Sequence, residues 1–321
     1  MKGIIGFLIV ISFCLGVGIH SSHAEAKKDL QGTITISGAW ALYPMVVKWK
    51  EEFQKIYPLV KIDVSAGGAG KGMADALSRA ADIGMVSREV SPEEAKKGAW
   101  WVSVTKDAVV PTVNEKNPVL KELLTQGVTQ KNFKGIWITG ELKNWEHVVQ
   151  PINKQLKAEV HVYTRSDACG AAETWATFLG KNQEDLLGIG VYGDPGLAEA
   201  VQKDILGIGF NNINYAYDAT TELPIKGINV VPIDINGNGH LDEEENFYST
   251  SDDMVKAIAT RKYPSPPARN LHFVSQGIPE RNEVREFISW VLTDGQRFVN
   301  EAGYINLTKE KLQEELKKLA K

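Results

Sequence analysis

The stretch from residue 32 to residue 87 alternates short β-branched runs with longer amphipathic runs, and this alternation restricts the possible folds strongly. Three runs have the pattern of strands, namely GTITISG (32–38), VKIDVSAGG (60–68) and ADIGMVS (81–87). Residues 42–58 and 70–80 have the apolar spacing of helices, and Pro58 ends the first of them. A β-α-β-α-β series of about 60 residues is typical of a parallel sheet with helices on both faces. We therefore predict an α/β fold.

Three turns that lead from a strand into a helix are rich in Gly, Ala and Ser. They are SGAWAL (37–42), SAGGAGKGM (65–73) and RSDACGAAE (165–173). The first N–H groups of a helix have no partner inside the helix, so such turns can hold an anion. In open α/β sheets they converge at the carboxyl ends of the strands, where ligands bind. We expect the three turns to build one ligand site.

The N-terminus, residues 1–24, has the form of a Sec-type signal peptide. One lysine precedes an apolar run over residues 4–19, and small residues lead to a cleavage site after Ala24. The apolar run is short for a helix that spans a membrane. We therefore predict export to the periplasm or to the outside of the cell. A lipid anchor on Cys14 is the alternative, although lipidated cysteines usually follow a small residue and this one follows Phe13.

The composition is that of an ordinary globular protein. The 321 residues are 43% hydrophobic and 24% charged, with a formal net charge of -4. Long runs of Lys or Arg are absent from the sequence, which argues against a nucleic-acid partner. Cleavage after Ala24 would leave Cys169 as the single cysteine. A single thiol forms no internal disulfide, so the hydrophobic core must stabilise the fold without one.

The order of the segments resembles that of the phosphate-binding proteins of bacterial ABC uptake systems, a branch of the two-lobed periplasmic solute-binding superfamily. The segments that carry the resemblance are ISGAWALYPMVVKW, SAGGAGKGM, ADIGMVSREV, TKDAVVPTVNEKNPV, GIWITGELKNW, RSDACGAAETWATF, YPSPPARNL and FISWVLTDGQRFVNEAGYINL. Together they extend over nearly the whole chain after the signal peptide. The resemblance implies a two-lobed periplasmic-binding-protein fold, in which each lobe has a mixed, mostly parallel sheet flanked by helices.

The same resemblance implies the division of the chain and its role. Residues 30–110 and about 255–321 would form lobe I, and residues 111–254 would form lobe II. The lobes would close over a small anion, phosphate or another, held in the cleft between them. A protein of this type is a monomer and not an enzyme, and it delivers its solute to a membrane ABC permease.

The resemblance also places the anion among residues of the three turns and beside Ser87. The set is Ala39, Trp40, Ala41, Gly68, Ala69, Gly70, Lys71, Ser87, Arg165, Asp167, Cys169, Gly170 and Ala171. About five positions that carry hydroxyls in the family are Ala, Trp, Lys or Cys in this chain. A hydrogen bond to a charged group is worth roughly 1.5 to 3 kcal/mol. Losing four or five of them would cancel most of a micromolar affinity, which is about 8 kcal/mol.

Three interpretations of the cleft therefore stand side by side. Trp40 and Ala39 would make the pocket larger and more apolar, which suits a bulkier or organic anion. Alternatively, main-chain N–H groups and Lys71 replace the hydroxyls and phosphate is retained. In the third interpretation, the site is degenerate and the protein is a calcium-stabilised secreted scaffold, adhesion or signalling protein. That protein would show no closure or stabilisation by a ligand.

Individual site residues have simpler explanations as well. Arg165 could be a surface salt-bridge residue, Asp167 a helix N-cap, Trp40 a core residue and Lys71 a solvated side chain. Cys169 at the start of a helix could have a lowered pKa, but a buried, inert thiol is the default. These alternatives stay open at the level of sequence.

A separate motif, DINGNGHLDEEE (234–245), fits the twelve-residue calcium loop at every ligand position. The predicted ligands are Asp234, Asn236, Asn238, the carbonyl of His240, Asp242 and Glu245. A strand-like run precedes the loop and a long helix does not follow it, so a calcium-driven opening of two helices is not expected. We predict a structural Ca²⁺ of weak affinity, roughly 10⁻⁴ to 10⁻³ M, in an insertion that the family resemblance does not require.

Overall fold

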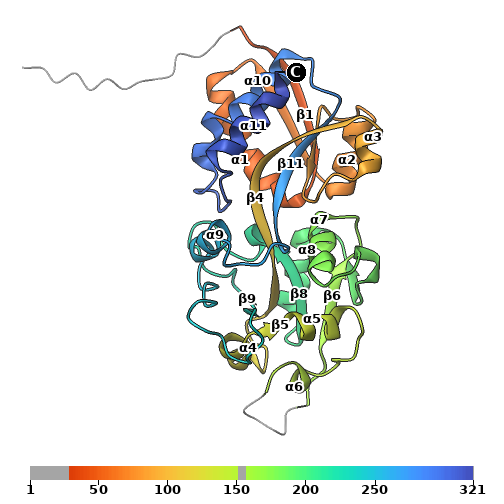
Figure 1. Ribbon diagram of the computed structural model, residues 1–321, viewed down its shortest axis with the longest axis vertical. Helices are drawn as coiled ribbons and strands as arrows, with labels where there is room; N and C mark the ends of the chain where they lie inside the picture. Colours follow the sequence, from red (N-terminus) through yellow and green to blue (C-terminus); the bar gives the residue numbers. More distant parts are fainter. Residues whose placement is uncertain (1–28, 151–156, 321) are drawn as a thin grey trace, which may run out of the picture.

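The computed structural model describes residues 29–150 and 157–320. The predicted signal peptide, residues 1–24, lies outside this part of the chain. The described residues form two α/β lobes, one above the other in Figure 1, and a long strand runs from one lobe into the other. The predicted fold class is confirmed.

Lobe I is built on a sheet with the strand order β2 (Val60–Ala66), β1 (Gly32–Gly38), β3 (Ile83–Val86) and β11 (Ala268–Gln276). The first three strands are parallel and β11 is antiparallel to β3. The helical elements of this lobe are η1 (Trp40–Leu42), α1 (Tyr43–Ile56), α2 (Ala69–Leu77), α3 (Pro92–Lys96), α10 (Asn282–Val291), η4 (Asp294–Phe298) and α11 (Lys309–Leu319). The predicted alternation over residues 32–87 is therefore confirmed.

Strand β4 (Ala99–Asn114) belongs to both lobes. Its first part pairs with β11 from Ala99 to Ala108, and its second part pairs with β8 (Gly207–Asn212) from Val109 to Val113. The predicted boundary near residue 110 therefore falls inside a continuous strand. Because the strand is hydrogen-bonded on both sides of this point, the lobes are joined by sheet and not by a loose linker.

Lobe II continues the sheet from β4 through β8 to β6 (His161–Arg165) and β7 (Ile189–Val191), and these last three strands are parallel. Strand β9 (Ile228–Val230) pairs with β4, and β5 (Val128–Thr129) pairs with β10 (Ile233–Asp234). The helical elements are α4 (Leu120–Gln126), α5 (Gln130–Trp137), α6 (Trp145–Val148), α7 (Gly170–Phe178), η2 (Gln183–Asp185), α8 (Gly193–Lys203), η3 (Ile213–Tyr215) and α9 (Ser251–Ala259). Helices α7 and α8 lie at the end of lobe II that faces lobe I (Figure 1).

Each lobe has its own hydrophobic core. In lobe I, Phe273 contacts both Trp49 and Phe287, and in lobe II Trp175 stacks on Phe210. The lobe II core also contains Met254 of α9 and Tyr263. The chain therefore returns to lobe I only after Tyr263, later than the predicted boundary at about residue 255, because the apolar face of α9 packs into lobe II.

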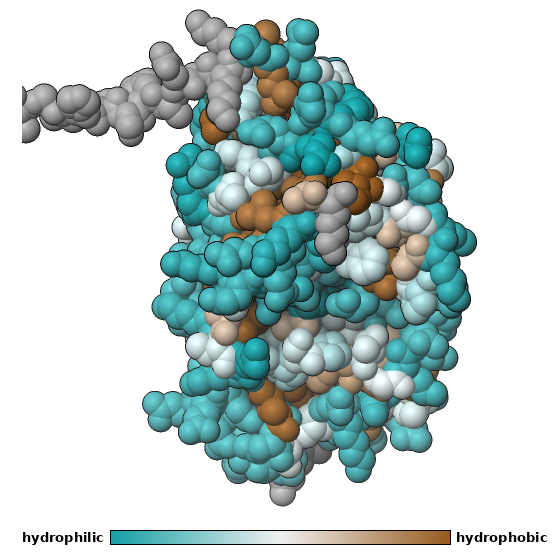
Figure 2. Space-filling view, turned by 45° about the horizontal axis from the view of Figure 1, so that its top comes forward, coloured by the Kyte–Doolittle hydropathy of each residue, from teal (hydrophilic) through white to brown (hydrophobic). Residues whose placement is uncertain are grey.

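The face of the molecule in Figure 2 is mostly hydrophilic, and its apolar residues form small separate patches. Within residues 29–150 and 157–320, every helix is too short or too polar to cross a bilayer. Most of the large apolar side chains of these residues lie in the two cores.

Candidate functional site

The predicted turns meet where the two lobes touch. The N–H of Gly70, at the start of α2 in lobe I, donates to the carbonyl oxygen of Ala168 in lobe II at 3.1 Å. Gly170, at the start of α7, packs so closely on lobe I that an added Cβ would lie 2.2 Å from the carbonyl oxygen of Ser87. Only glycine allows this approach. The lobes are therefore closed on each other through their main chains.

The first turn contributes an aromatic contact across the same junction. The indole of Trp40 lies against Gly193 at the start of α8, and its ring meets the ring of Tyr192 edge to face with 6.4 Å between centroids. The hydroxyl of Tyr215 donates to the carbonyl oxygen of Trp40 at 3.2 Å. The indole Nε1 is buried without a hydrogen-bond partner among the described residues. Trp40 is therefore a half-buried contact between the lobes and not a residue of one core.

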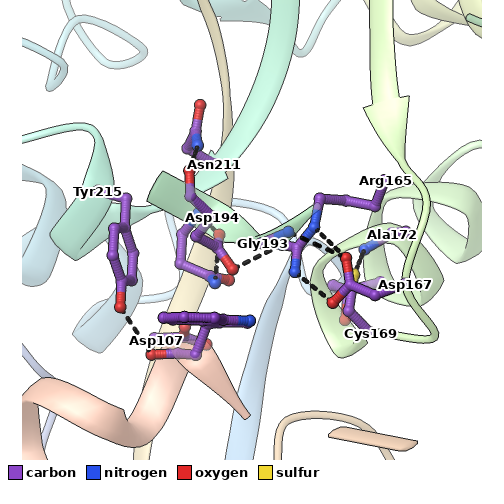
Figure 3. A network of polar contacts seen from close by, with 12 residues as sticks. Asp107, Arg165, Asp167, Cys169, Ala172, Gly193, Asp194, Asn211 and Tyr215 are labelled. Carbon is purple, nitrogen blue, oxygen red and sulfur yellow. Dashed lines mark hydrogen bonds and ion pairs between the residues drawn. The ribbon is translucent and has the colours of Figure 1, made fainter. Parts of the chain in front are cut away.

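Arg165 ends strand β6 and its side chain is fully buried. Its Nε and Nη2 donate to the two carboxylate oxygens of Asp167 at 2.8 and 2.7 Å, and its Nη1 donates to Oδ2 of Asp194 at 2.6 Å (Figure 3). Burial opposes the charge of the guanidinium, but the neighbouring Asp194 and Asp167 carboxylates raise its pKa above the ordinary value. The surface salt bridge considered for Arg165 is thus wrong, since this ion cluster is internal.

The two carboxylates around Arg165 are held by further donors. Oδ1 of Asp167 accepts the N–H of Gly193 at 3.2 Å, and Oδ1 of Asp194 accepts Nδ2 of Asn212 at 2.7 Å. The N-cap of α7 is Cys169, whose Sγ accepts the N–H of Ala172. The N-cap interpretation of Asp167 is therefore wrong, because this residue lies two positions ahead of the N-cap and its carboxylate binds Arg165.

A second buried arginine adjoins this cluster. Arg269 on β11 donates through Nε and Nη2 to the two oxygens of Asp107 on β4, at 2.9 and 3.2 Å, and through Nη1 to Thr174 at 2.9 Å. Its Nη2 also donates to Oδ1 of Asn212, whose amide group reaches Asp194.

We call the connected set the cleft network; it consists of Asp107, Arg165, Asp167, Asp194, Asn212 and Arg269. Two arginines face three carboxylates in this set, so it carries one excess negative charge when all five groups are ionised. The excess lies on the side of Arg165, which contacts two carboxylates.

Two predicted site residues, Lys71 and Cys169, have the simpler roles considered for them from the sequence. The side chain of Lys71 is 47% exposed and forms an ion pair with Asp75 one turn further along α2, which agrees with a solvated side chain. The thiol of Cys169 is buried, and burial raises its pKa to about 12. A thiol in this state is inert at neutral pH, so the lowered pKa considered for Cys169 is wrong.

A cavity of about 810 Å³ lies beside Arg269 and not at the Gly-rich turns. Its wall includes Arg88 and Glu173, but Arg88 is already bound by Glu94 through two hydrogen bonds of 2.7 and 2.9 Å. The cationic groups of this wall are thus partly neutralised. It is a polar cavity of mixed charge and not a preformed anion pocket.

Sequence reasoning missed most of the cleft network. Asp194 lies in the turn GDPG that opens α8, and Asp107 is a carboxylate within the apolar run that becomes β4. A charged residue inside a buried strand is a usable signal, because such a charge requires a partner. The identity of that partner, Arg269, could not be deduced from spacing.

The predicted metal ligands lie in lobe II, in the connection between β10 and α9, close to β5 and α4. In residues 29–150 and 157–320, there is no group of three His, Cys, Asp or Glu side chains arranged to hold a metal ion. The acidic side chains of this connection are therefore not preassembled around a common point.

Comparison with known proteins gives a family-model match and relatives that extend over nearly the whole chain. Residues 23–295 match the family model described as PBP superfamily domain. The phosphate-binding protein PstS of Staphylococcus haemolyticus is 22% identical over 325 residues, which cover 99% of this chain and 95% of that protein.

Solved structures share the fold. A putative phosphate ABC transporter substrate-binding protein with bound phosphate from Clostridium perfringens has a TM-score of 0.70 at 21% identity, covering 86% of this chain and 100% of that one. An ABC-type phosphate transport receptor from Vibrio cholerae has a TM-score of 0.61 at 20% identity, with 85% and 100% covered.

Proposed function

The chain belongs to the PBP superfamily, and we propose that it is the extracytoplasmic substrate-binding protein of a phosphate-type ABC importer. It captures phosphate or another small anion between its lobes and delivers it to a membrane permease. It performs no chemistry on the solute and works as a monomer. The relatives over nearly the whole chain length support this assignment.

The observation that carries the proposal is the meeting of elements from both lobes around Arg165. The starts of α2 and η1 come from lobe I, and the start of α7 and Arg165 come from lobe II. A ligand bound to helix starts on both sides would hold the lobes together, because each lobe supplies donors that the other lacks. Capture by closure follows from this arrangement.

The excess carboxylate of the cleft network bears on the choice of anion. Each Nη of Arg165 carries two hydrogens, and the contacts to Asp167 and Asp194 use one on each nitrogen. The remaining hydrogens are buried in the closed structure and would reach a ligand only when the lobes separate. The adjacent negative charges oppose a highly charged anion. We expect the anion of lower charge to bind more tightly among anions of similar shape, because repulsion by these carboxylates grows with ligand charge.

The test is a thermal-shift panel on the purified mature protein, with phosphate, other oxyanions and small organic anions as ligands. A ligand at 100 times its dissociation constant adds about 2.7 kcal/mol to the free energy of unfolding. The variant Arg165→Met should abolish the shift, while the exposed Arg281→Gln in lobe I should retain it. Native mass spectrometry of the purified protein would identify a ligand that remains bound through purification.

A flat response across the whole panel, with no co-purified anion, would favour the scaffold interpretation instead. In that case the closed junction between Gly70 and Ala168 would be a permanent contact between the lobes. Scattering measurements with and without ligand separate the two cases, because only a solute carrier changes its lobe angle on binding.

A further inference from the structure

The last residue of the segment 234–245, Glu245, has a buried carboxylate with one oxygen that lacks a partner among the described residues. Glu245 is only 6% exposed. Its Oε1 accepts the N–H groups of Ile235 at 3.1 Å and Asn236 at 3.0 Å. Its Oε2 is buried and has no hydrogen-bond partner among the described residues. A buried carboxylate oxygen without a partner is costly, so it calls for a cation that the protein atoms do not supply.

The opposite end of the segment has a second buried carboxylate, Asp234, which is 2% exposed. Its two oxygens accept the N–H groups of Gly237 at 2.7 Å and Gly239 at 2.9 Å. Both glycines have positive φ, 75° and 81°, and a Cβ on either would touch nothing within 4 Å. Glycine is thus required here by backbone conformation and not by crowding. The backbone is wound around Asp234.

Three side chains of the segment already converge on one atom. Nδ2 of Asn236 and Nδ2 of Asn238 both donate to Oδ2 of Asp242, at 2.7 and 2.8 Å. The amide oxygens of Asn236 and Asn238 accept the N–H groups of Asn238 and His240. Rotation of each side chain would exchange this bond for a position beside the same carboxylate. A cation at this meeting point would replace the two amide N–H groups as the partner of Asp242.

The charge of the segment favours a divalent cation. Its twelve residues include five carboxylates, Asp234, Asp242, Glu243, Glu244 and Glu245, and neither Lys nor Arg. Its oxygen donors occur at the ligand positions of a calcium loop, and calcium takes roughly six to eight oxygens at about 2.3 to 2.6 Å. Nitrogen or sulfur ligands, which zinc prefers, are not offered at these positions except by the ring of His240.

We infer that residues 234–245 bind one calcium ion through side-chain oxygens of Asp234, Asn236, Asn238, Asp242 and Glu245 and the carbonyl oxygen of His240. The acidic ligands are not grouped beforehand, so the segment must tighten around the ion. This ordering accounts for a weak affinity, about 10⁻⁴ to 10⁻³ M, in the range of extracellular modules. The inference does not depend on what the cleft binds.

The position of the segment defines what the ion would stabilise. The N–H of Leu241 donates to the carbonyl of Thr125 at the end of α4, and the N–H of Ile233 donates to the hydroxyl of Tyr248 at 3.1 Å. The segment also leads into α9, which precedes the return to lobe I. A bound ion would therefore fasten α4, β5 and β10 at one side of lobe II.

The experiment compares the mature protein with the variants Glu245→Gln and Glu244→Gln. Glu244 is exposed and is not at a ligand position, so it is the matched control. Melting temperatures are measured in 10 mM CaCl₂, in 10 mM MgCl₂ and in EDTA at about constant ionic strength, with direct titration of Ca²⁺ by calorimetry. Tb³⁺ provides an optical probe, because Tyr248 lies beside the segment and can sensitise its emission.

Calcium, but not magnesium, should raise the melting temperature of the wild type and of Glu244→Gln by about 2–4 °C. Glu245→Gln should lose the shift and bind Ca²⁺ at least about tenfold more weakly. In EDTA the same variant should melt at or above the wild-type temperature, because it removes a buried unpaired charge. Stoichiometry should be one ion per chain.

Identical wild-type melting curves in calcium and EDTA, together with no heat of binding and no Tb³⁺ emission that Ca²⁺ displaces, would overturn the inference. So would a Glu245→Gln variant that keeps the full calcium shift. The titrations of wild type stand on their own if the variant fails to fold.

Discussion

The two buried arginines of the cleft network differ in their balance of charge. Arg269 faces one carboxylate, Asp107, which it holds with two parallel hydrogen bonds. Arg165 faces two carboxylates, Asp167 and Asp194. One buried guanidinium is therefore matched and the other has an excess of negative charge beside it. Burial of an arginine therefore does not by itself indicate its role, whereas the number of carboxylates that contact it does.

The matched pair links two neighbouring strands at positions directly opposite each other. Asp107 lies on β4, which crosses between the lobes, and Arg269 lies on β11 beside it (Figure 1). The unmatched cluster around Arg165 lies at the junction that has to open for a solute to enter. A one-to-one pair has no exchangeable contact, whereas a guanidinium with two carboxylates can give up one of them to a ligand. We therefore expect stability to depend on Arg269 and binding to depend on Arg165.

The largest effect should come from Asp107→Asn. This change removes the carboxylate that pairs with the buried Arg269, which typically costs about 3–5 kcal/mol. Chemical denaturation measures the loss, and the exposed Asp63→Asn on β2 is the control, expected within about 0.5 kcal/mol of wild type. A loss of less than about 1 kcal/mol for Asp107→Asn would show that this ion pair contributes little to holding β4 and β11 together.

A smaller effect is expected from Asp167→Asn, which keeps the size of the side chain. Arg165 retains Asp194, so the free energy of unfolding should fall by only about 1 kcal/mol. The same change removes the excess negative charge and should tighten binding of a small anion several-fold, measured by titration calorimetry. If it destabilises the protein as much as Asp107→Asn does, the proposed difference between the two arginines is wrong.

The thiol of Cys169 reports on the same junction, and its titration leaves the stability of the protein unchanged at neutral pH. Its folded pKa of about 12 lies above the value of 9.0 for an unperturbed thiol, so the neutral form stabilises the folded state. This contribution is complete below about pH 9 and is lost as the pH rises from about 9 to 12. At pH 8 the thiolate population should be about a thousandfold lower than in a free thiol.

The rate of labelling by a thiol reagent at pH 8 measures the thiolate population of Cys169. The protein unfolded in denaturant is the reference. Modification of the native protein at the rate of the unfolded chain would show that the start of α7 is open to solvent. Cys169→Ser identifies the alkaline loss of stability that belongs to the thiol. Burial also raises the pKa of tyrosines such as Tyr217 and Tyr248, so they too favour the folded state less as the pH rises.

Local pattern was sufficient to predict the framework of lobe I. Residues 32–87 alternate between the spacing of strands and of helices, and the structure follows with β1, α1, β2, α2 and β3. The Gly-rich turns were also visible, because small residues at helix starts are a local feature. The family followed from the order of such segments along the chain.

The sequence by itself therefore determined the α/β elements, the family and the turns of the cleft, because each depends on residues a few positions apart. The tertiary structure alone decided where α9 packs, that β4 crosses between the lobes, and which acids hold each arginine. Arg269 is 162 positions from Asp107, and Arg165 is 29 positions from Asp194. Pairing over such distances depends on how the whole chain packs, and a buried charge indicates only that some partner exists.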